Sequence, residues 1–292
     1  MNLNITAYST ALFSTWINIE ELGILFDAGD GVTSGLLQKS RKIKHVFISH
    51  ADRDHLTGLL QLNQLNARKG FPKIYYPADC GTFPALKAFQ LKFDPNIKGA
   101  IWNKLIHKER IEIRKDVYVE CIRNEHVRVP IGTHKSLSFR IYQTKQKLKS
   151  EYKNLDSKEI KPLIAEKGKD NVMQTVRTNI LSYSADTPVD DLDKWNNSQI
   201  LIHESTFLED SDNNVVVSKG NKHSKLNEVL LMVSKSNVQT LILNHFSSRY
   251  SKEEIDNNVI SLCRKYNVQS SVKIVYPGQI HRDVLNQKSI WK

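Results

Sequence analysis

Four side chains that could bind a metal ion lie within six residues of the sequence, directly after an apolar run. The stretch is residues 49–56, SHADRDHL, and its candidate ligands are His50, Asp52, Asp54 and His55. Imidazole nitrogens and carboxylate oxygens are the donors that Zn²⁺ and Mn²⁺ accept, at about 2.0–2.2 Å. A polar loop with Asp52 or Asp54 as a helix N-cap is the alternative interpretation. The density of potential ligands favours a metal site.

Two later apolar runs also end in a residue that could bind the same ions. Asp186 follows the run at residues 179–183, and His245 follows the run at residues 240–243. A single Asp or His at a strand end is more often a turn former, so neither residue indicates a metal site alone. With residues 50–55, they form one set of candidate ligands.

Short β-rich runs and segments with helical spacing occur along the whole chain. The expected strands cover residues 23–26, 45–48, 117–122, 179–183, 199–202 and 240–243, and the expected helices cover residues 56–68, 225–236 and 252–266. This mixture predicts an α/β protein in which helices pack outside sheets. The candidate ligands then lie at strand ends, where open α/β folds carry their chemistry. No repeat, linker or low-complexity tract divides the chain, so we expect residues 1–292 to form a single domain.

The composition is that of an ordinary water-soluble protein of 292 residues, 40% of them hydrophobic. The first thirty residues resemble no signal peptide and no apolar run approaches the roughly 18 residues that span a bilayer, so we expect a cytoplasmic protein without membrane contact. The three cysteines lack a C-x-x-C pair and predict neither disulfides nor a thiolate zinc site. The net charge of +11 makes a nucleic-acid partner reasonable without establishing it.

One segment departs from the strand-and-helix pattern. Residues 143–170 contain eight lysines and five acidic residues, with apolar residues spaced irregularly between them. The segment indicates an excursion from the core. A solvated pair of helices without a special role is the alternative that composition leaves open.

The order of these pieces resembles the metallo-β-lactamase superfamily. The superfamily's H-x-H-x-D-H motif matches His50, Asp54 and His55, and residues 185–187 (ADT) are similar to its Gly-Asp-Thr strand end. Residues 245–250 (HFSSRY) correspond more closely still. The resemblance covers most of the chain and implies the four-layer αββα sandwich of that superfamily.

Two loops and the lysine-rich segment resemble one branch of the superfamily, short-form tRNase Z of the plant type. Residues 203–208 (HESTFL) are similar to its glutamate-bearing HEAT loop, and residues 222–224 (KHS) to its HST loop. Residues 147–152 and 155–160 are similar to its tRNA-binding exosite. Residues 143–172 would then be an exosite-like excursion within the domain, and the resemblance also suggests a homodimer.

The resemblance implies a pair of divalent metal ions, with Zn²⁺ favoured and Mn²⁺ as the other candidate. The expected ligands are His50, Asp52 and His126 for one ion, Asp54, His55 and His245 for the other, and Asp186 as the bridge. The ligand from the middle strand stays open between His126 and His134. Asp52 stands where the family has a histidine, and its oxygen donor would favour Mn²⁺ or weaken Zn²⁺ occupancy.

The implied reaction is hydrolysis of a phosphodiester in precursor tRNA, which removes the 3′ trailer and leaves a 3′-hydroxyl and a 5′-phosphate. Asp54 would orient the attacking water. His223, oriented by Glu204, would protonate the leaving oxygen, although without the resemblance both residues read as ordinary loop residues. The expected substrate contacts are Arg249, Ser247, Lys147 and Lys149. For Arg249, a surface salt bridge is the alternative.

Two other functions fit the same residues. One is a metal-dependent phosphodiesterase that acts on a small or cyclic nucleotide, with the basic segment incidental. The other is an RNA-binding relative whose metal site is impaired by Asp52. The presence of Glu204 and His223 argues against an impaired site.

Overall fold

Two β-sheets face each other in the computed structural model, which describes residues 2–208 and 223–292. The first sheet has the order β1-β2-β3-β4-β5-β6. Its strands are β1 (Ile5–Thr10), β2 (Ser14–Ile19), β3 (Ile24–Phe26), β4 (His45–Phe47), β5 (Lys73–Pro77) and β6 (Ile101–Leu105). The first three strands pair antiparallel, and β3 to β6 pair parallel.

The second sheet has the order β13-β12-β11-β10-β9-β8-β7. Its strands are β7 (Arg110–Arg114), β8 (Val117–Arg123), β9 (Leu137–Leu148), β10 (Met173–Tyr183), β11 (Ser198–Glu204), β12 (Thr240–Asn244) and β13 (Ser271–Ile274). Strands β7 to β10 pair antiparallel, and β10 to β13 pair parallel. All six strands expected from the sequence are present.

Aromatic side chains from both sheets fill the space between them. The Phe26 ring of β3 lies 5.4 Å from Phe139 of β9 and 5.2 Å from Tyr183 of β10, centroid to centroid. Phe47 of β4 lies 5.5 Å from Phe139. Strands β3 and β4 are buried on both faces, and apart from His45 all their residues are apolar, as is typical of strands covered on both sides.

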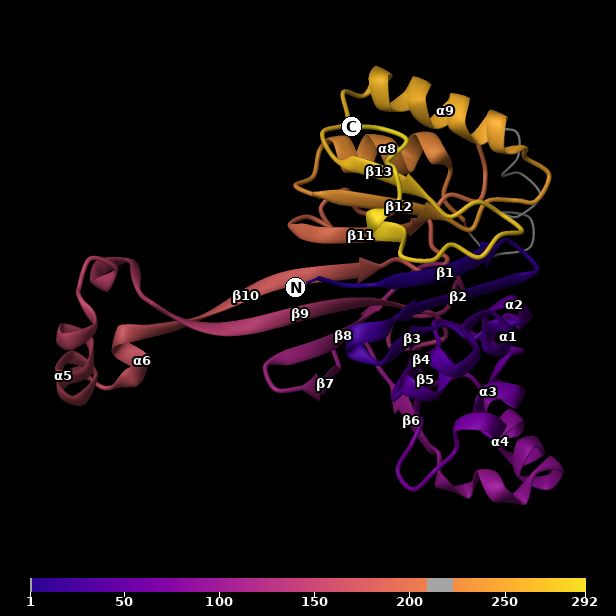
Figure 1. The fold of residues 1–292 in the computed structure, drawn as a ribbon, viewed down its shortest axis with the longest axis horizontal. Coiled ribbons are helices and arrows are strands. Elements are labelled where there is room, and N and C mark those ends of the chain that lie inside the picture. The colour runs from indigo at the N-terminus through magenta and orange to yellow at the C-terminus, as the bar shows by residue number, and fades with distance from the viewer. Residues whose placement is uncertain (1, 209–222) are drawn as a thin grey trace.

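Helices cover the outer face of each sheet and complete four layers (Figure 1). The α-helices on the first sheet are α1 (Val32–Leu36), α2 (Arg53–Leu56), α3 (Leu59–Asn66) and α4 (Thr82–Phe93), and those on the second are α8 (Leu226–Ser234) and α9 (Lys252–Lys265). The 3₁₀ helices are η1 (Glu20–Leu22), η2 (Leu37–Lys42), η3 (Pro95–Gly99), η4 (Ser150–Tyr152) and η6 (Val284–Asn286). Within the described ranges, no helix is long and apolar enough to cross a membrane.

The outer halves of β9 and β10 leave the body of the molecule as a two-stranded arm (Figure 1). Helices α5 (Ser157–Lys167) and α6 (Lys169–Val172) form its tip. The α5 helix begins where the Asp156 carboxylate accepts hydrogen bonds from two backbone amides, a capping box that needs no buried face. The strand expected at residues 179–183 is therefore only the inner end of β10, because its outer half has few buried apolar residues to reveal it.

A charged cluster braces the arm where it joins the body. The guanidinium of Arg177 on β10 donates to both carboxylate oxygens of Glu120 on β8, at 3.2 and 2.5 Å. The same guanidinium lies 3.7 Å from the ring centroid of Tyr142 on β9. Since these residues come from three neighbouring strands, they fix the direction in which the arm leaves the sheet.

Candidate active site

The candidate ligands lie at the ends of strands from both sheets and meet between them. Residues 49–55 follow β4, Asp186 follows β10 and His245 follows β12, as expected from the sequence. Ala185 and His245 both have positive φ, 50° and 61°. Backbone in this region costs on the order of 1 kcal/mol for a non-glycine residue and is typical of functional sites.

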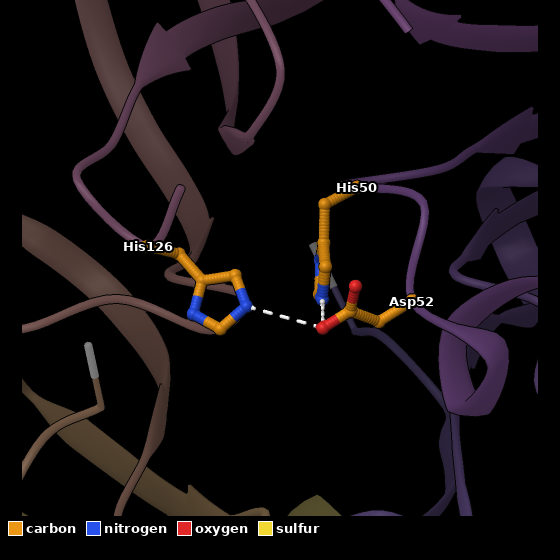
Figure 2. A group of neighbouring side chains, drawn as sticks. All are labelled: His50, Asp52 and His126. Carbon is orange, nitrogen blue, oxygen red and sulfur yellow. Dashed lines mark hydrogen bonds and ion pairs between the residues drawn. The ribbon is translucent and has the colours of Figure 1, made fainter. Parts of the chain in front are cut away.

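The first group of ligands consists of His50, Asp52 and His126 (Figure 2). The Nε2 atoms of both histidines point at the Asp52 carboxylate, each 3.5 Å from its Oδ2. Asp52 does occupy the N-cap of α2, but its side chain makes no hydrogen bond to the described backbone of that helix. The nearby imidazoles of His126 and His50 hold the pKa of Asp52 below its ordinary value, so the carboxylate is charged.

The second group consists of Asp54, His55 and His245. Asp54 Oδ2 lies 3.4 Å from the Nε2 atoms of both histidines. Asp54 and His55 are adjacent on α2, and close backbone contact fixes this helix: a Cβ at Gly29 would lie 2.3 Å from the Asp54 carbonyl oxygen. Only glycine at that position lets α2 approach the end of β3 so closely.

Asp186 lies between the two groups. Its Oδ2 is 3.2 Å from His55 Nε2 and 3.3 Å from His245 Nε2, and 3.8 Å from His50 Nε2 on the other side. Burial opposes the charged form of Asp186, but His245 and His55 hold its pKa well below its ordinary value. The site therefore offers a buried, charged oxygen to both groups.

These separations match a metal site better than a hydrogen-bond network. Hydrogen bonds join heavy atoms at about 2.7–3.2 Å. Two ligands of a tetrahedral ion, each about 2.1 Å from it, lie about 3.4 Å apart. The Nε2 atoms of His50 and His55 are also buried without a hydrogen-bond partner among the described residues. Because an unpaired buried nitrogen costs stability, these residues fit a divalent cation.

Asp27, a residue that sequence reasoning missed, orients the ligands of both groups. Its Oδ2 accepts a hydrogen bond from His55 Nδ1 at 2.8 Å, and its Oδ1 accepts one from the Ser49 hydroxyl at 2.8 Å. The Ser49 hydroxyl gives its only hydrogen to Asp27, so its oxygen accepts the hydrogen bond from His50 Nδ1, which lies 2.9 Å away. Both imidazoles therefore direct Nε2 towards the site, as metal-binding histidines do.

Glu204 plays the same role on the opposite side of the site. Its Oε1 lies 3.0 Å from His223 Nδ1, and its Oε2 accepts from the Thr206 hydroxyl at 2.6 Å. The Thr206 oxygen lies 2.9 Å from His245 Nδ1. Burial opposes the charged form of Glu204, but the neighbouring His223 lowers its pKa. One buried carboxylate thus positions both His223 and a candidate ligand.

Known proteins are similar to this chain in sequence over most of its length. The chain is 30% identical to tRNase Z TRZ1 of Arabidopsis thaliana over 260 residues, which cover 85% of this chain and 86% of that protein. It is 31% identical to the ribonuclease Z of Methanocaldococcus jannaschii, over 86% of this chain and 84% of the other. The chain belongs to the ribonuclease Z family.

The wider superfamily and the fold agree with this membership. The Beta-lactamase superfamily domain matches residues 23–149. Among solved structures, the metallo-β-lactamase fold protein YhfI of Bacillus subtilis has a TM-score of 0.65 at 15% identity, over 96% of this chain and all of the other. The short form of human tRNase Z has a TM-score of 0.60 at 17% identity, over 96% of this chain and 99% of that chain. The metallo-β-lactamase fold expected from the sequence is confirmed, and this ribonuclease Z family member is a hydrolytic nuclease.

The two candidates for the middle-strand ligand, His126 and His134, lie in different places. His126 faces Asp52, and its backbone N–H donates to the buried Asn124 side chain at 3.3 Å. His134 instead lies with Nδ1 3.3 Å from the Asp79 carboxylate. Among the described residues, His134 is in none of the groups that could hold an ion. The geometry therefore favours His126.

The four expected substrate contacts divide into two places. The Ser247 amide donates to the Thr206 carbonyl at 3.2 Å, so this loop adjoins the Glu204 loop. The Arg249 guanidinium lies 5.5 and 5.0 Å from the ring centroids of Phe207 and Tyr250. Lys147 and Lys149 lie instead on the arm, on β9 and just beyond it. Of residues 222–224, Lys222 falls outside the described residues.

Replacing Asp27 with asparagine should weaken metal binding by about 10- to 100-fold, the usual effect of removing a carboxylate behind a histidine ligand. Asparagine tolerates the positive φ of 54° at this position, so the backbone should persist. Competition with a chromophoric chelator measures the affinity. Asp79→Asn, which alters the comparable pair with His134, is the matched control and should bind metal normally. Equal affinities in both variants would show that Asp27 does not support the ligands.

Proposed function

We propose that this chain is a metal-dependent endoribonuclease that removes 3′ trailers from precursor tRNA. The observation that carries the proposal is the Glu204–His223 pair beside the ligand groups, because a hydrolase of RNA needs a proton donor for its leaving oxygen. The proteins at about 30% identity are named tRNase Z or ribonuclease Z. The products would be a tRNA ending in a 3′-hydroxyl and a trailer with a 5′-phosphate.

Seven residues would hold a pair of divalent cations. One ion would take His50, Asp52 and His126, the other would take Asp54, His55 and His245, and Asp186 would bridge. When bound, such ions lower the pKa of water towards neutrality and offset charge on the phosphate. Zn²⁺ suits the histidine-rich groups, and Mn²⁺ is the alternative where Asp52 adds an oxygen donor.

The chain's own residues would orient the attacking water and deliver the proton. Asp54 belongs to the second ligand group, and the backbone N–H of Leu12 donates to its Oδ2 at 3.2 Å, which fixes the carboxylate. His223 is held at Nδ1 by Glu204, so its Nε2 is the nitrogen that would protonate the leaving ribose oxygen. The neighbouring His223 lowers the pKa of Glu204 despite its burial, so Glu204 is ionised and its oxygen accepts the hydrogen bond from His223 Nδ1.

The arm and the Arg249 loop would bind the rest of the RNA. Lys147 is exposed on the arm, and Lys149 is partly exposed beside it. Ammonium groups attract phosphates with little sequence preference, which suits binding to the body of many tRNAs. The guanidinium of Arg249 could pair with two oxygens of one phosphate. A homodimer and a cytoplasmic location remain predictions of the sequence.

The substrate class is tested by incubating the protein with a 3′-extended tRNA precursor and, separately, with a cyclic nucleotide, each with Zn²⁺ or Mn²⁺. We expect cleavage of the precursor, with ends that a 3′-hydroxyl-dependent ligase accepts. Hydrolysis of the cyclic nucleotide alone would assign the site to small phosphodiesters. RNA that binds but stays intact with either metal would indicate a binding protein with an impaired site.

Restoring the family's histidine through Asp52→His should shift metal preference towards Zn²⁺, by roughly tenfold or about 1.4 kcal/mol in the ratio of Zn²⁺ to Mn²⁺ affinities. The Asp52 side chain is 48% exposed, so an imidazole can be accommodated there. Isothermal titration with each metal measures the ratio. An unchanged ratio would mean that residue 52 does not contact the ion.

A further inference from the structure

Two large apolar side chains lie in solvent on the turn between β1 and β2. Leu12 is 88% exposed and Phe13 is 62% exposed. Both follow directly from β1, whose residues are nearly all buried. An exposed apolar pair contributes little to folding stability, so its position in the structure is the informative property.

This turn is attached to the candidate active site on both sides. The Leu12 amide donates to Asp54 Oδ2 at 3.2 Å, and the Ala11 amide donates to the carbonyl of Phe246 at 3.2 Å. Phe246 is the residue after the candidate ligand His245. The backbone that carries the two exposed side chains is therefore held next to residues that would bind the metal ions.

The turn is also anchored internally, so its side chains are presented by fixed backbone. The Phe13 amide donates to the Thr10 carbonyl at 3.1 Å, and the Thr10 hydroxyl accepts from the Gly278 amide at 2.8 Å. Leu12 has a φ of 71°, a conformation that glycine adopts more easily than leucine. A leucine kept here, with its side chain in water, is unfavourable for the turn alone.

We propose that Leu12 and Phe13 form a stacking platform for an unpaired nucleobase next to the scissile phosphodiester. The inference rests on the proposed function, and it identifies residues that bind RNA beside the cleavage site. Each base has an apolar face, and aromatic side chains stack on such faces with little sequence preference. A nucleotide whose phosphate reaches the ligand groups must place its base at the edge of the site, where this turn lies. The net charge of +11 attracts the RNA backbone to the protein.

The platform is tested with two variants and a substrate that lacks the base. Phe13→Ser and Leu12→Gly remove the side chains, and Leu12→Gly also suits the backbone at that position. Phe93→Ser, at the 73%-exposed residue that ends α4, is the control for removing an exposed aromatic ring. The RNA substrates are a 3′-extended tRNA precursor and the same RNA with an abasic nucleotide on either side of the cleavage site.

On the intact precursor, Phe13→Ser should lower kcat/KM by roughly tenfold, the size expected for one lost base stack, whereas Phe93→Ser should match the wild type. On the abasic precursor, kcat/KM of the wild type should fall by the same factor. Phe13→Ser should have the same kcat/KM on the abasic precursor as on the intact one. Phe13→Trp should retain the wild-type rate. The Phe13 variants and Phe93→Ser should hydrolyse methyl p-nitrophenyl phosphate, which has no base, at the wild-type rate.

Three results would overturn the platform. The Phe13 and Leu12 variants could cleave the intact precursor at the wild-type rate. Phe13→Ser on the abasic precursor could show the product of the two separate losses in kcat/KM, which would mean that the Phe13 side chain does not contact the missing base. Hydrolysis of the small diester could fall equally, which would show that the turn only supports Asp54. A wild-type protein that fails to cleave any precursor contradicts the proposed function itself, and the platform with it.

Discussion

His55→Ala should lower cleavage of a 3′-extended tRNA precursor by about 10³-fold or more and release at least one equivalent of metal. His55 is the residue on which the site converges: its Nε2 faces Asp186 and Asp54, and its Nδ1 is held by Asp27. Alanine leaves these three carboxylates near one another without the intervening imidazole. Clustered carboxylates still attract cations, so some metal binding should remain, but the geometry of the second ion would be lost.

The matched control is His134→Ala, which removes the histidine that pairs with Asp79 outside the ligand groups. This variant should keep the wild-type metal content and cleavage rate. His126→Ala should instead behave like His55→Ala, because it removes a candidate ligand of the first group. Circular dichroism establishes that each variant is folded. Full activity in His55→Ala, or loss of metal in His134→Ala, would place the metal site elsewhere.

His223→Ala should lower precursor cleavage by about 10²- to 10⁴-fold, the usual contribution of a general acid. A ribose 3′-oxygen is a poor leaving group and needs a proton as the bond to phosphorus breaks. A p-nitrophenolate ion needs none. Hydrolysis of methyl p-nitrophenyl phosphate by His223→Ala should therefore stay within a few-fold of the wild-type rate, with unchanged metal content.

Glu204→Gln tests the same proton donor, His223, through its hydrogen-bond partner. Glutamine preserves the size of the side chain but removes the charged oxygen that accepts the hydrogen bond from His223 Nδ1. Precursor cleavage should therefore fall by about tenfold or more in this variant, whereas hydrolysis of methyl p-nitrophenyl phosphate should stay within a few-fold of the wild-type rate. A wild-type rate of precursor cleavage in Glu204→Gln, or an equal loss of both substrates in His223→Ala, would rule out His223 as the general acid.

Apart from His126, the candidate ligands lie in the sequence where short apolar runs end, and the structure brings them together. Asp186 and His245 could be recognised at the ends of β10 and β12 from local pattern alone. Because these strands end at the same site, candidate ligands that are distant in sequence lie close together. The resemblance added His126 and the Glu204–His223 pair, which no local pattern marks.

The supporting residues were not predictable from local pattern. Asp27 also follows an apolar run, but its partners His55 and Tyr183 lie 28 and 156 residues away, and only the fold brings them together. The outer halves of β9 and β10 were hidden for a different reason. They are paired to each other in solvent, so their alternation of apolar and polar residues is weak. Likewise, no pattern in the sequence marks Leu12 and Phe13 as exposed residues.

The most direct test of the two-metal account is a titration of metal-free protein with Zn²⁺ or Mn²⁺, followed by cleavage of the tRNA precursor at each step. The account predicts no cleavage without metal and a rate that rises until about two equivalents are bound, as expected for a shared two-ion centre. In the Mn²⁺ form, the electron paramagnetic resonance spectrum should show two coupled ions. Cleavage by the metal-free protein, or a rate that is complete at one equivalent with an isolated Mn²⁺ spectrum, would contradict the account.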